Sequence, residues 1–390
     1  MTKMKTFIYH PSTYFGGASV LFYRLFTANN YKEFYFIDCI NGFTQKKVGD
    51  HCKLILNTDK EKLSNEINDN DIIICISTQI SGLLNDLSNL NVNPKILIWI
   101  VHPYEASLIF FPFAKRITSK LGYDLGRAYI KTYYKKYKTL QNFIMNNSGK
   151  SLFYMDTACI RATDYFLNLN LASHKNNESY LLPIPFIPYE KEIKTNFFFN
   201  GELNLGYFGR IEDFKSPPLR SLLNDILNSK LKIKTHIIGN GRDLKKIKDE
   251  FSKKLDIIFL GEMDNLDARK YIYDNIDIIF CMGTAALDTA SMGVPTVLLN
   301  PSNKVINQKY NWLYHTDGFT LGDYTDSPWF EEDGNSFTNI IEHINTNIML
   351  VSKRNHEYVF YYHSIDSVIN KVMSNITKSN IKLNDLKALF

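Results

Sequence analysis

Two basic side chains follow a short apolar segment in the second half of the chain. Leu203–Phe208 is predicted to be a strand, and Gly209-Arg210 and Lys215 come directly after it. Arginine offers a planar fork of donors and lysine a compact point charge, so the two could grip a diphosphate from one loop. The alternative is a pair of solvated cations on a surface loop.

A run of small residues follows another predicted strand, Ile276–Cys281. Gly283 and Thr284 open a predicted helix, and free backbone amides there, together with the helix dipole, would form an anion site. Asp288 lies about one turn into that helix and could accept hydrogen bonds from ribose hydroxyls. The alternative is a close-packed helix N-terminus. Because Arg210 and Lys215 are expected in the same region, we favour a ligand site.

The first half offers weaker candidates, each after a predicted strand. His102 follows Lys95–Val101 and could bond a sugar or move a proton, although a lone histidine is more often structural. The pair Gly16-Gly17 would let the backbone approach a phosphate or sugar, or would simply form a turn. Asp156 is also a good N-cap, which makes it the weakest candidate.

Strands that alternate with helical segments position these residues. The runs are apolar throughout, as expected for parallel strands buried on both faces. The predicted strands are Thr6–Tyr9, Phe34–Cys39, Asp71–Ser77, Lys95–Val101, Leu152–Met155, Leu203–Phe208, Lys232–Ile238, Asp256–Leu260, Ile276–Cys281 and Thr296–Leu299. Ligands of such sheets bind beyond the carboxyl ends of the strands, which is where the candidate residues fall.

A proline-rich segment, Leu181–Pro188, separates two α/β halves, since three prolines cannot sit in a helix or a central strand. We therefore expect three parts: an α/β domain over residues 1–188, a second α/β domain over 189–355, and C-terminal helices over 356–390 that pack back on the first domain. Two doubly wound domains facing each other would place both sets of strand ends around one cleft.

Composition narrows the class of protein. The 390 residues include 45% apolar and 22% charged side chains, which suits a globular protein of two domains. The net charge of +5 is too mild for a dedicated nucleic-acid binder. No secretory signal or spanning segment is apparent, so we expect a cytoplasmic protein. The five cysteines form no metal-ligand spacing, and Asp69-Asn70-Asp71 precedes its strand, so we expect no metal and no cofactor.

The positive charge concentrates in Phe113–Met145, which holds eight basic side chains, one acidic side chain and five tyrosines. Basic and aromatic residues beside an apolar stretch suit the inner face of an anionic membrane. The alternatives are a solvated helical face and RNA binding by base stacking. We expect peripheral membrane contact and no nucleic-acid partner. We call four lysines of this segment the lysine cluster: Lys131, Lys135, Lys136 and Lys138.

The second half resembles the nucleotide-sugar-binding domain of GT-B glycosyltransferases, whose fold has two facing Rossmann-like domains. The Gly209-Arg210 and Lys215 spacing is similar to the diphosphate-gripping motif of the large retaining family 4. The stretch from Asp288 to Pro295 lies where that family has Glu-Ala-x-x-x-Gly-x-Pro. Further landmarks match at Gly239 and at Gly261-Glu262. The resemblance covers about Leu203–Pro301 well and the first half loosely.

This resemblance implies a role for each candidate. Arg210 and Lys215 would stabilise the departing diphosphate, Asp288 would hold the ribose, and His102 would contact the sugar. Gly16 and Gly17 would lie on the acceptor side. The remaining donor-side residues would be Gly209, Gly239, Gly261, Glu262, Gly283 and Thr284.

The sequence departs from the family at one position. The family usually carries a second glutamate eight residues before the ribose-binding glutamate, and here that position is Phe280. The string from Gly283 to Asp288 is also similar to inverting GT-B enzymes such as the lipid A disaccharide synthase, so both stereochemical outcomes stay open.

We therefore expect an α/β protein of GT-B architecture with a C-terminal helix, acting as a metal-independent hexosyltransferase. It would move a sugar from a nucleotide-diphosphate sugar to a glycan or polyprenyl-linked acceptor in bacterial surface polysaccharide or lipopolysaccharide assembly. The alternatives are a nucleotide-sugar epimerase of the same fold and a catalytically silent GT-B-like partner subunit.

Overall fold

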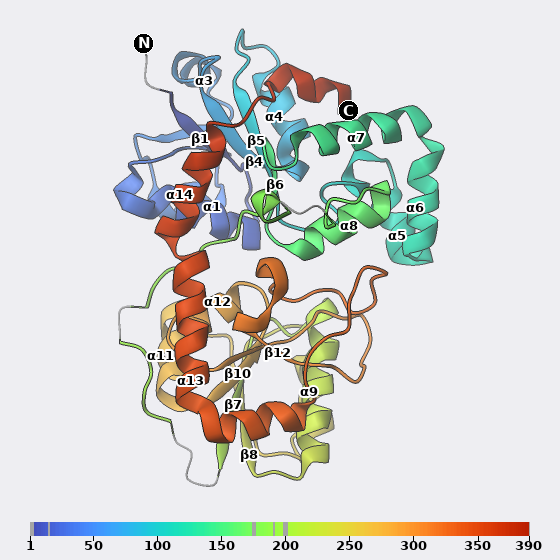
Figure 1. Ribbon diagram of the computed structural model, residues 1–390. Helices are drawn as coiled ribbons and strands as arrows, with labels where there is room; N and C mark the ends of the chain where they lie inside the picture. Colours follow the sequence, from blue (N-terminus) through green and yellow to red (C-terminus); the bar gives the residue numbers. More distant parts are fainter. Residues whose placement is uncertain (1–3, 15, 174–176, 190–191, 198–201, 390) are drawn as a thin grey trace. The chain divides into compact units, whose positions relative to one another are not determined.

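The computed structural model describes residues 4–14, 16–173, 177–189, 192–197 and 202–389 (Figure 1). The chain packs into two compact units: unit 1 runs up to Pro185 and resumes at Ile365, and unit 2 comprises Phe186–Ser364. The chain therefore passes between the units after Pro185 and after Ser364. The sequence had placed these boundaries after residues 188 and 355.

Unit 1 is built on a sheet whose described strands are all parallel, in the order β3-β2-β1-β4-β5-β6. The strands are β1 (Thr6–Tyr9), β2 (Tyr35–Asp38), β3 (Leu54–Leu56), β4 (Ile72–Ile76), β5 (Lys95–Ile100) and β6 (Leu152–Tyr154). The order reverses between β1 and β4, as in dinucleotide-binding folds. Strand β3, of three residues, was not predicted.

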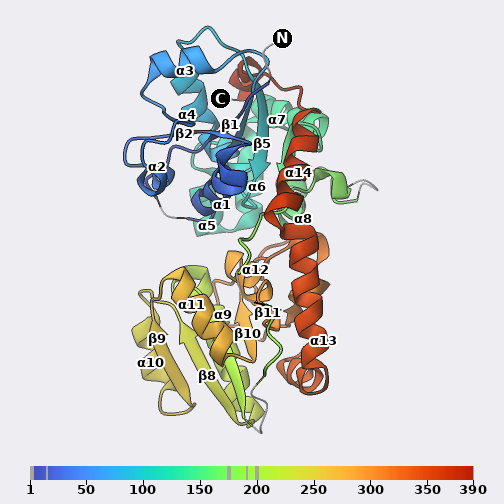
Figure 2. The same ribbon diagram turned by 90° about the vertical axis from the view of Figure 1, so that its left-hand side faces the viewer.

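Helices cover both faces of this sheet. They are α1 (Gly17–Thr27), α2 (Phe43–Val48), α3 (Lys60–Glu66), α4 (Ile80–Leu87), α5 (Ala114–Leu121), α6 (Tyr123–Thr132), α7 (Tyr134–Asn147), α8 (Thr157–Leu167) and α14 (Ile365–Ile376). Helix α14 lies beside α1 (Figure 2), and its residues Val368 and Val372 join the cluster formed by Phe22 of α1 and Trp99 of β5. The C-terminal segment thus completes the core of unit 1.

Unit 2 repeats the same strand order. Its sheet runs β12-β11-β10-β7-β8-β9, which reverses between β7 and β10. The strands are β7 (Leu203–Phe208), β8 (Ile233–Ile238), β9 (Ile257–Gly261), β10 (Ile278–Cys281), β11 (Thr296–Leu298) and β12 (Asn311–Trp312). The two-residue strand β12 was not predicted and pairs antiparallel with β11, so the expectation of a purely parallel sheet is wrong at this edge.

The helices of unit 2 are α9 (Ser216–Ser229), α10 (Leu244–Phe251), α11 (Asn265–Asn275), α12 (Thr284–Ala290) and α13 (Phe337–His363). Helices α9 and α13 bury one face of the sheet. Phe280 of β10 is fully buried in that core, with its ring 5.4 Å from the ring of Tyr310. The position where an acid was noted as missing is therefore part of the sheet core.

The proline-rich segment contains neither helix nor regular strand, as predicted. Within unit 1, the Arg24 side chain donates to the Pro185 carbonyl (2.9 Å) and the Trp99 indole to the Leu182 carbonyl (2.9 Å). Within unit 2, the Phe186 amide donates to the His363 carbonyl (2.9 Å). Side chains thus donate hydrogen bonds to backbone carbonyls of a segment that forms no regular strand pairing.

Candidate functional site

The loops after β7, β8 and β9 are bonded to one another at the carboxyl edge of the unit 2 sheet. The Gly209 amide donates to the Ile238 carbonyl (3.1 Å), and the Gly239 amide donates to the Gly261 carbonyl (2.7 Å). A side chain at Gly239 would collide with the Gly209 carbonyl, and φ there is +144°, so glycine is required. Gly209, Gly239 and Gly261 therefore hold the backbone of this edge together.

Arg210 and Lys215 both lie on the loop that follows β7. Arg210 is exposed, and its guanidinium pairs with Glu212 (3.0 Å). Lys215 ends a short 3-10 turn before α9 and is half-buried. Burial and, to a smaller extent, the positive charge of Arg210 lower the pKa of the Lys215 ammonium to about 8. Two neighbouring cations at a switch point of the sheet are suited to an anion of more than one charge.

The loop between β10 and α12 lies next to these cations. Burial raises the pKa of the Cys281 thiol at the end of β10 to about 12, and the charges of both Lys215 and Asp288 act on that thiol. Lys215 and Asp288, which were predicted from separate motifs, therefore both lie near the end of β10, and Arg210 lies near Lys215.

The backbone amide of Gly283 was expected to be free, but it is hydrogen-bonded in the structure. Its φ is +66°, and its N–H donates to the Leu321 carbonyl (2.8 Å). The expectation of a free amide is wrong because the acceptor lies 38 residues downstream, where no local pattern points to it. Thr284 is the first residue of α12, which is only 7 residues long.

Asp288 lies in a buried ion pair that the sequence did not reveal. Its Oδ1 is 2.6 Å from the Arg269 guanidinium, and both side chains are 4% exposed. Arg269 also donates to the Ile187 carbonyl (3.0 Å), so one side chain of α11 fixes both Asp288 and the linker. The pair orients the carboxylate, and no sequence pattern pointed to Arg269 as the partner of Asp288.

Glu262 follows Gly261 of β9 and is exposed. No side chain would clash at Gly261, but its φ of +72° favours glycine. Glu262 thus stands at the rim of the same carboxyl edge.

In unit 1, Gly16 and Gly17 begin α1 at the corresponding edge. A side chain at Gly17 would meet open space, so this position permits close approach from outside. His10, which follows β1, is buried. Its Nε2 lies 3.1 Å from the Ser19 hydroxyl, which itself donates to the Tyr14 carbonyl (2.8 Å). His10 Nε2 must therefore carry the proton and donate.

His102 follows β5, as predicted. Its Nδ1 accepts the Tyr104 amide (3.3 Å), which in the neutral ring leaves the proton on Nε2. Burial and, to a smaller extent, the positive charge of Lys115 lower the pKa of His102 to about 4. At neutral pH this ring can donate a hydrogen bond from Nε2.

Glu105, three residues on, was not predicted to be a site residue. Its Oε2 accepts the Val101 amide (3.2 Å), and the side chain is buried. Burial raises the pKa of the Glu105 carboxyl to about 7. The only available signal was its position after a strand. Asp156, in contrast, accepts the Cys159 amide (2.8 Å) at the start of α8, which is the N-cap geometry.

Solved structures resemble this chain over nearly its whole length. A lipopolysaccharide outer core galactosyltransferase, WaaB, aligns with a TM-score of 0.56 at 11% identity, over 95% of this chain and 99% of that one. HepE of Anabaena in complex with UDP aligns with a TM-score of 0.58 at 10% identity, over 96% and 100%. OtsA aligns with a TM-score of 0.54 at 12% identity, over 96% and 99%. The chain has the GT-B fold.

Sequence comparisons add nothing to this assignment. No family model matches the chain, and no curated protein matches it. At 10–12% identity the structural likeness identifies the GT-B fold alone.

The GT-B fold clarifies the departure at Phe280. Only Met282 and Gly283 separate β10 from α12, so counting eight residues back from Asp288 reaches the interior of the strand.

The basic segment forms three consecutive helices, α5 to α7. Lys131 lies in the last turn of α6, and Lys135, Lys136 and Lys138 lie near the start of α7. Phe113, Leu121 and Tyr134 of the same segment are more than 60% exposed. None of the described helices is long and apolar enough to cross a membrane.

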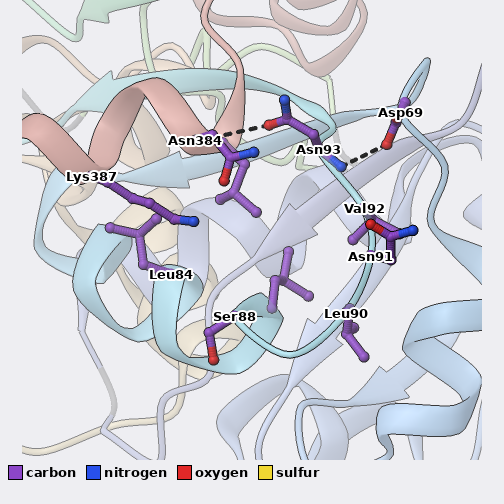
Figure 3. Close-up of a pocket in the computed structure, with 11 residues that line it drawn as sticks. Asp69, Leu84, Ser88, Leu90, Asn91, Val92, Asn93, Asn384 and Lys387 are labelled. Atoms are coloured by element: carbon purple, nitrogen blue, oxygen red, sulfur yellow. Dashed lines mark hydrogen bonds between the residues drawn. The ribbon is translucent and has the colours of Figure 1, made fainter.

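A hollow of about 250 Å³ in unit 1 lies at the opposite edge of the sheet, before β4 and β5 (Figure 3). Asp69 accepts the Asn93 amide there (2.6 Å), and Asn93 accepts the Asn384 amide (3.0 Å). Asp69 thus supports a loop. Over the described ranges, no group of three or more His, Cys, Asp or Glu residues is arranged to hold a metal ion.

Proposed function

We propose that this protein is a glycosyltransferase that uses a nucleotide-diphosphate sugar as donor. The observation that carries the proposal is the cluster of Arg210, Lys215 and Asp288 at the switch point of unit 2. The likeness to HepE, which has been solved with UDP and with UDP-glucose, supports it.

In this proposal unit 2 binds the donor. Arg210 and Lys215 neutralise the negative charge that grows on the diphosphate as the sugar leaves, which is a large catalytic requirement. Asp288, oriented by Arg269, accepts hydrogen bonds from the ribose. Gly209, Gly239 and Gly261 hold the loops, and Glu262, Gly283 and Thr284 complete the donor side. The reaction needs neither a metal nor another cofactor.

Unit 1 binds the acceptor near Gly16 and Gly17, and His102 donates from Nε2 to a sugar hydroxyl. The acceptor is a glycan or a polyprenyl-linked sugar of bacterial surface polysaccharide or lipopolysaccharide assembly. The likeness to WaaB supports this context.

We further propose that α5 to α7 contact the cytoplasmic face of an anionic membrane. Lys135 and Lys136 lie in the first turn of α7, which has no acidic residue. Cations at a helix N-terminus oppose the helix dipole and cost about 0.3–1 kcal/mol each. A binding role accounts for keeping them there, and exposed Phe113 and Leu121 could enter the interface.

Incubation with UDP-, GDP- and TDP-sugars, with slow donor hydrolysis as the readout, tests the proposal. We expect one nucleotide class to be hydrolysed, and Arg210→Ala and Lys215→Ala to abolish turnover without unfolding the protein. Lys253→Ala is the matched control, because Lys253 is exposed in unit 2 and lies before β9, away from the carboxyl edge. Absence of hydrolysis with every donor, or normal turnover in both variants, would contradict the proposal.

A further inference from the structure

The chain after β5 folds back so that an acid lies against the end of the strand. Val101 is the first residue beyond β5, and its amide donates to Glu105 Oε2 (3.2 Å). The Glu105 amide donates to the His102 carbonyl (3.0 Å), which closes the turn. The Glu105 carboxyl is therefore held at the carboxyl edge of the sheet, where ligands of such folds bind.

Among three titratable side chains, His10 after β1 and His102 and Glu105 after β5, Glu105 is the best placed to accept a proton. His102 Nδ1 already accepts the Tyr104 amide, so its ring presents a donor. His10 Nε2 donates to Ser19, and its Nδ1 is enclosed by the protein. In contrast, Glu105 Oε1 has no hydrogen-bond partner among the described residues and is not enclosed.

The environment of Glu105 also shifts the pKa of its carboxyl group. Burial raises the pKa of Glu105 to about 7, and the Val101 amide and the Lys115 charge oppose that rise. Lys115, near the start of α5, is the charged group that acts on both Glu105 and His102. A general base works best when its pKa lies near the working pH, a condition that Glu105 meets.

We propose that Glu105 is the general base of an inverting sugar transfer, an inference that rests on the proposed glycosyltransferase function. The acceptor oxygen forms a bond to the anomeric carbon while the bond from that carbon to the diphosphate oxygen breaks. The diphosphate leaves with the electron pair, and the acceptor proton passes to the Glu105 carboxylate. Attack from the face opposite the diphosphate keeps that proton away from the leaving group, so a separate base is needed.

Hydrolysis of the donor tests this step, because water then takes the place of the acceptor. The probe is the α-linked nucleotide sugar that the wild-type protein hydrolyses, and proton NMR identifies the first anomer released. We expect the β-anomer, a rate that rises with pH through about 7, and a loss of at least about 100-fold in kcat for Glu105→Gln at unchanged KM. The variant should have no pH dependence near 7.

Glu61→Gln is the matched control, because Glu61 is exposed on α3 of the same unit. Release of the α-anomer, or wild-type turnover in a folded Glu105→Gln protein, would overturn the base and leave the glycosyltransferase proposal standing. Absence of hydrolysis by the wild-type protein with every donor would overturn both. Infrared difference spectra of wild type against Glu105→Gln, which need no substrate, should show a carboxyl that titrates near pH 7; a carboxylate already ionised at pH 5 would overturn the base by itself.

Discussion

The carboxyl edges of the two sheets have the same strand order but different chemistry. At the unit 2 edge, Arg210 and Lys215 are cations held on loops that glycines bond tightly together. At the unit 1 edge, His102 and Glu105 are buried titratable groups whose pKa values burial shifts in opposite directions. One fold thus presents side chains that are positively charged at pH 7 in one copy and groups suited to giving or taking a proton in the other.

This difference follows from what each edge must recognise under the proposed function. A diphosphate carries its charge throughout the reaction, so side chains that are cationic at pH 7 suit it. An acceptor hydroxyl is neutral until it reacts, so a weak base in a desolvated position suits it. Changes that exchange or remove these features should therefore have effects specific to each unit.

The largest expected effect is on the stability of unit 2. Arg269→Met would remove the buried cation that pairs with the Asp288 carboxylate, which we expect to lower the free energy of unfolding by about 3–5 kcal/mol. Urea denaturation of the variant against Lys270→Met, an exposed neighbour on α11, measures this. Adding Asp288→Asn should restore part of the loss. A loss below about 1 kcal/mol would mean that the pair does not fix this edge.

The next largest expected effect is on the binding of unit 1 to anionic vesicles. Changing the lysine cluster to glutamine should weaken binding to phosphatidylglycerol-containing vesicles by about 1 kcal/mol for each lysine. The loss should shrink as salt is raised. The matched control set in unit 2 is Lys232, Lys245, Lys246 and Lys253. Equal losses in the two sets, measured by vesicle sedimentation, would remove the membrane contact.

A smaller expected effect is on the pH dependence of stability, through Glu105 at the unit 1 edge. Because the pKa of Glu105 is raised from 4.5 to about 7 in the folded protein, ionising it opposes folding. This cost grows as pH rises from 4.5 to 7 and is fully present above 7, where it reaches roughly 3 kcal/mol. Glu105→Gln should therefore raise the melting temperature at pH 8 much more than at pH 5. A gain that is equal at both pH values would contradict the pKa shift.

Much of the fold could be predicted because buried parallel strands are continuously apolar. All ten predicted strands correspond to strands of the structure. The two that were missed, β3 and β12, have three and two residues and carry no pattern. The doubly wound architecture was predicted for the same reason, from strands that alternate with helices.

The site was less accessible to sequence reasoning because its contacts are long-range. The partner of Asp288 is Arg269 on a different helix, and the acceptor for the Gly283 amide is Leu321. Glu105 has no motif around it, and its role depends on burial that only the folded turn produces. The sequence shows which residue types follow the strands, but it does not show which residues they contact in the folded protein.

Calorimetric titration with UDP tests the central claim, that unit 2 binds a nucleotide diphosphate through Arg210 and Lys215. We expect the wild-type protein to bind UDP, and Lys215→Met to bind it at least about tenfold more weakly, as loss of a charged hydrogen bond implies. Because Lys215 loses its proton above about pH 8, wild-type affinity should fall between pH 7 and 9, whereas the variant should not change. Lys253→Met should match the wild type. Equal affinity in wild type and Lys215→Met at pH 7 would contradict the account.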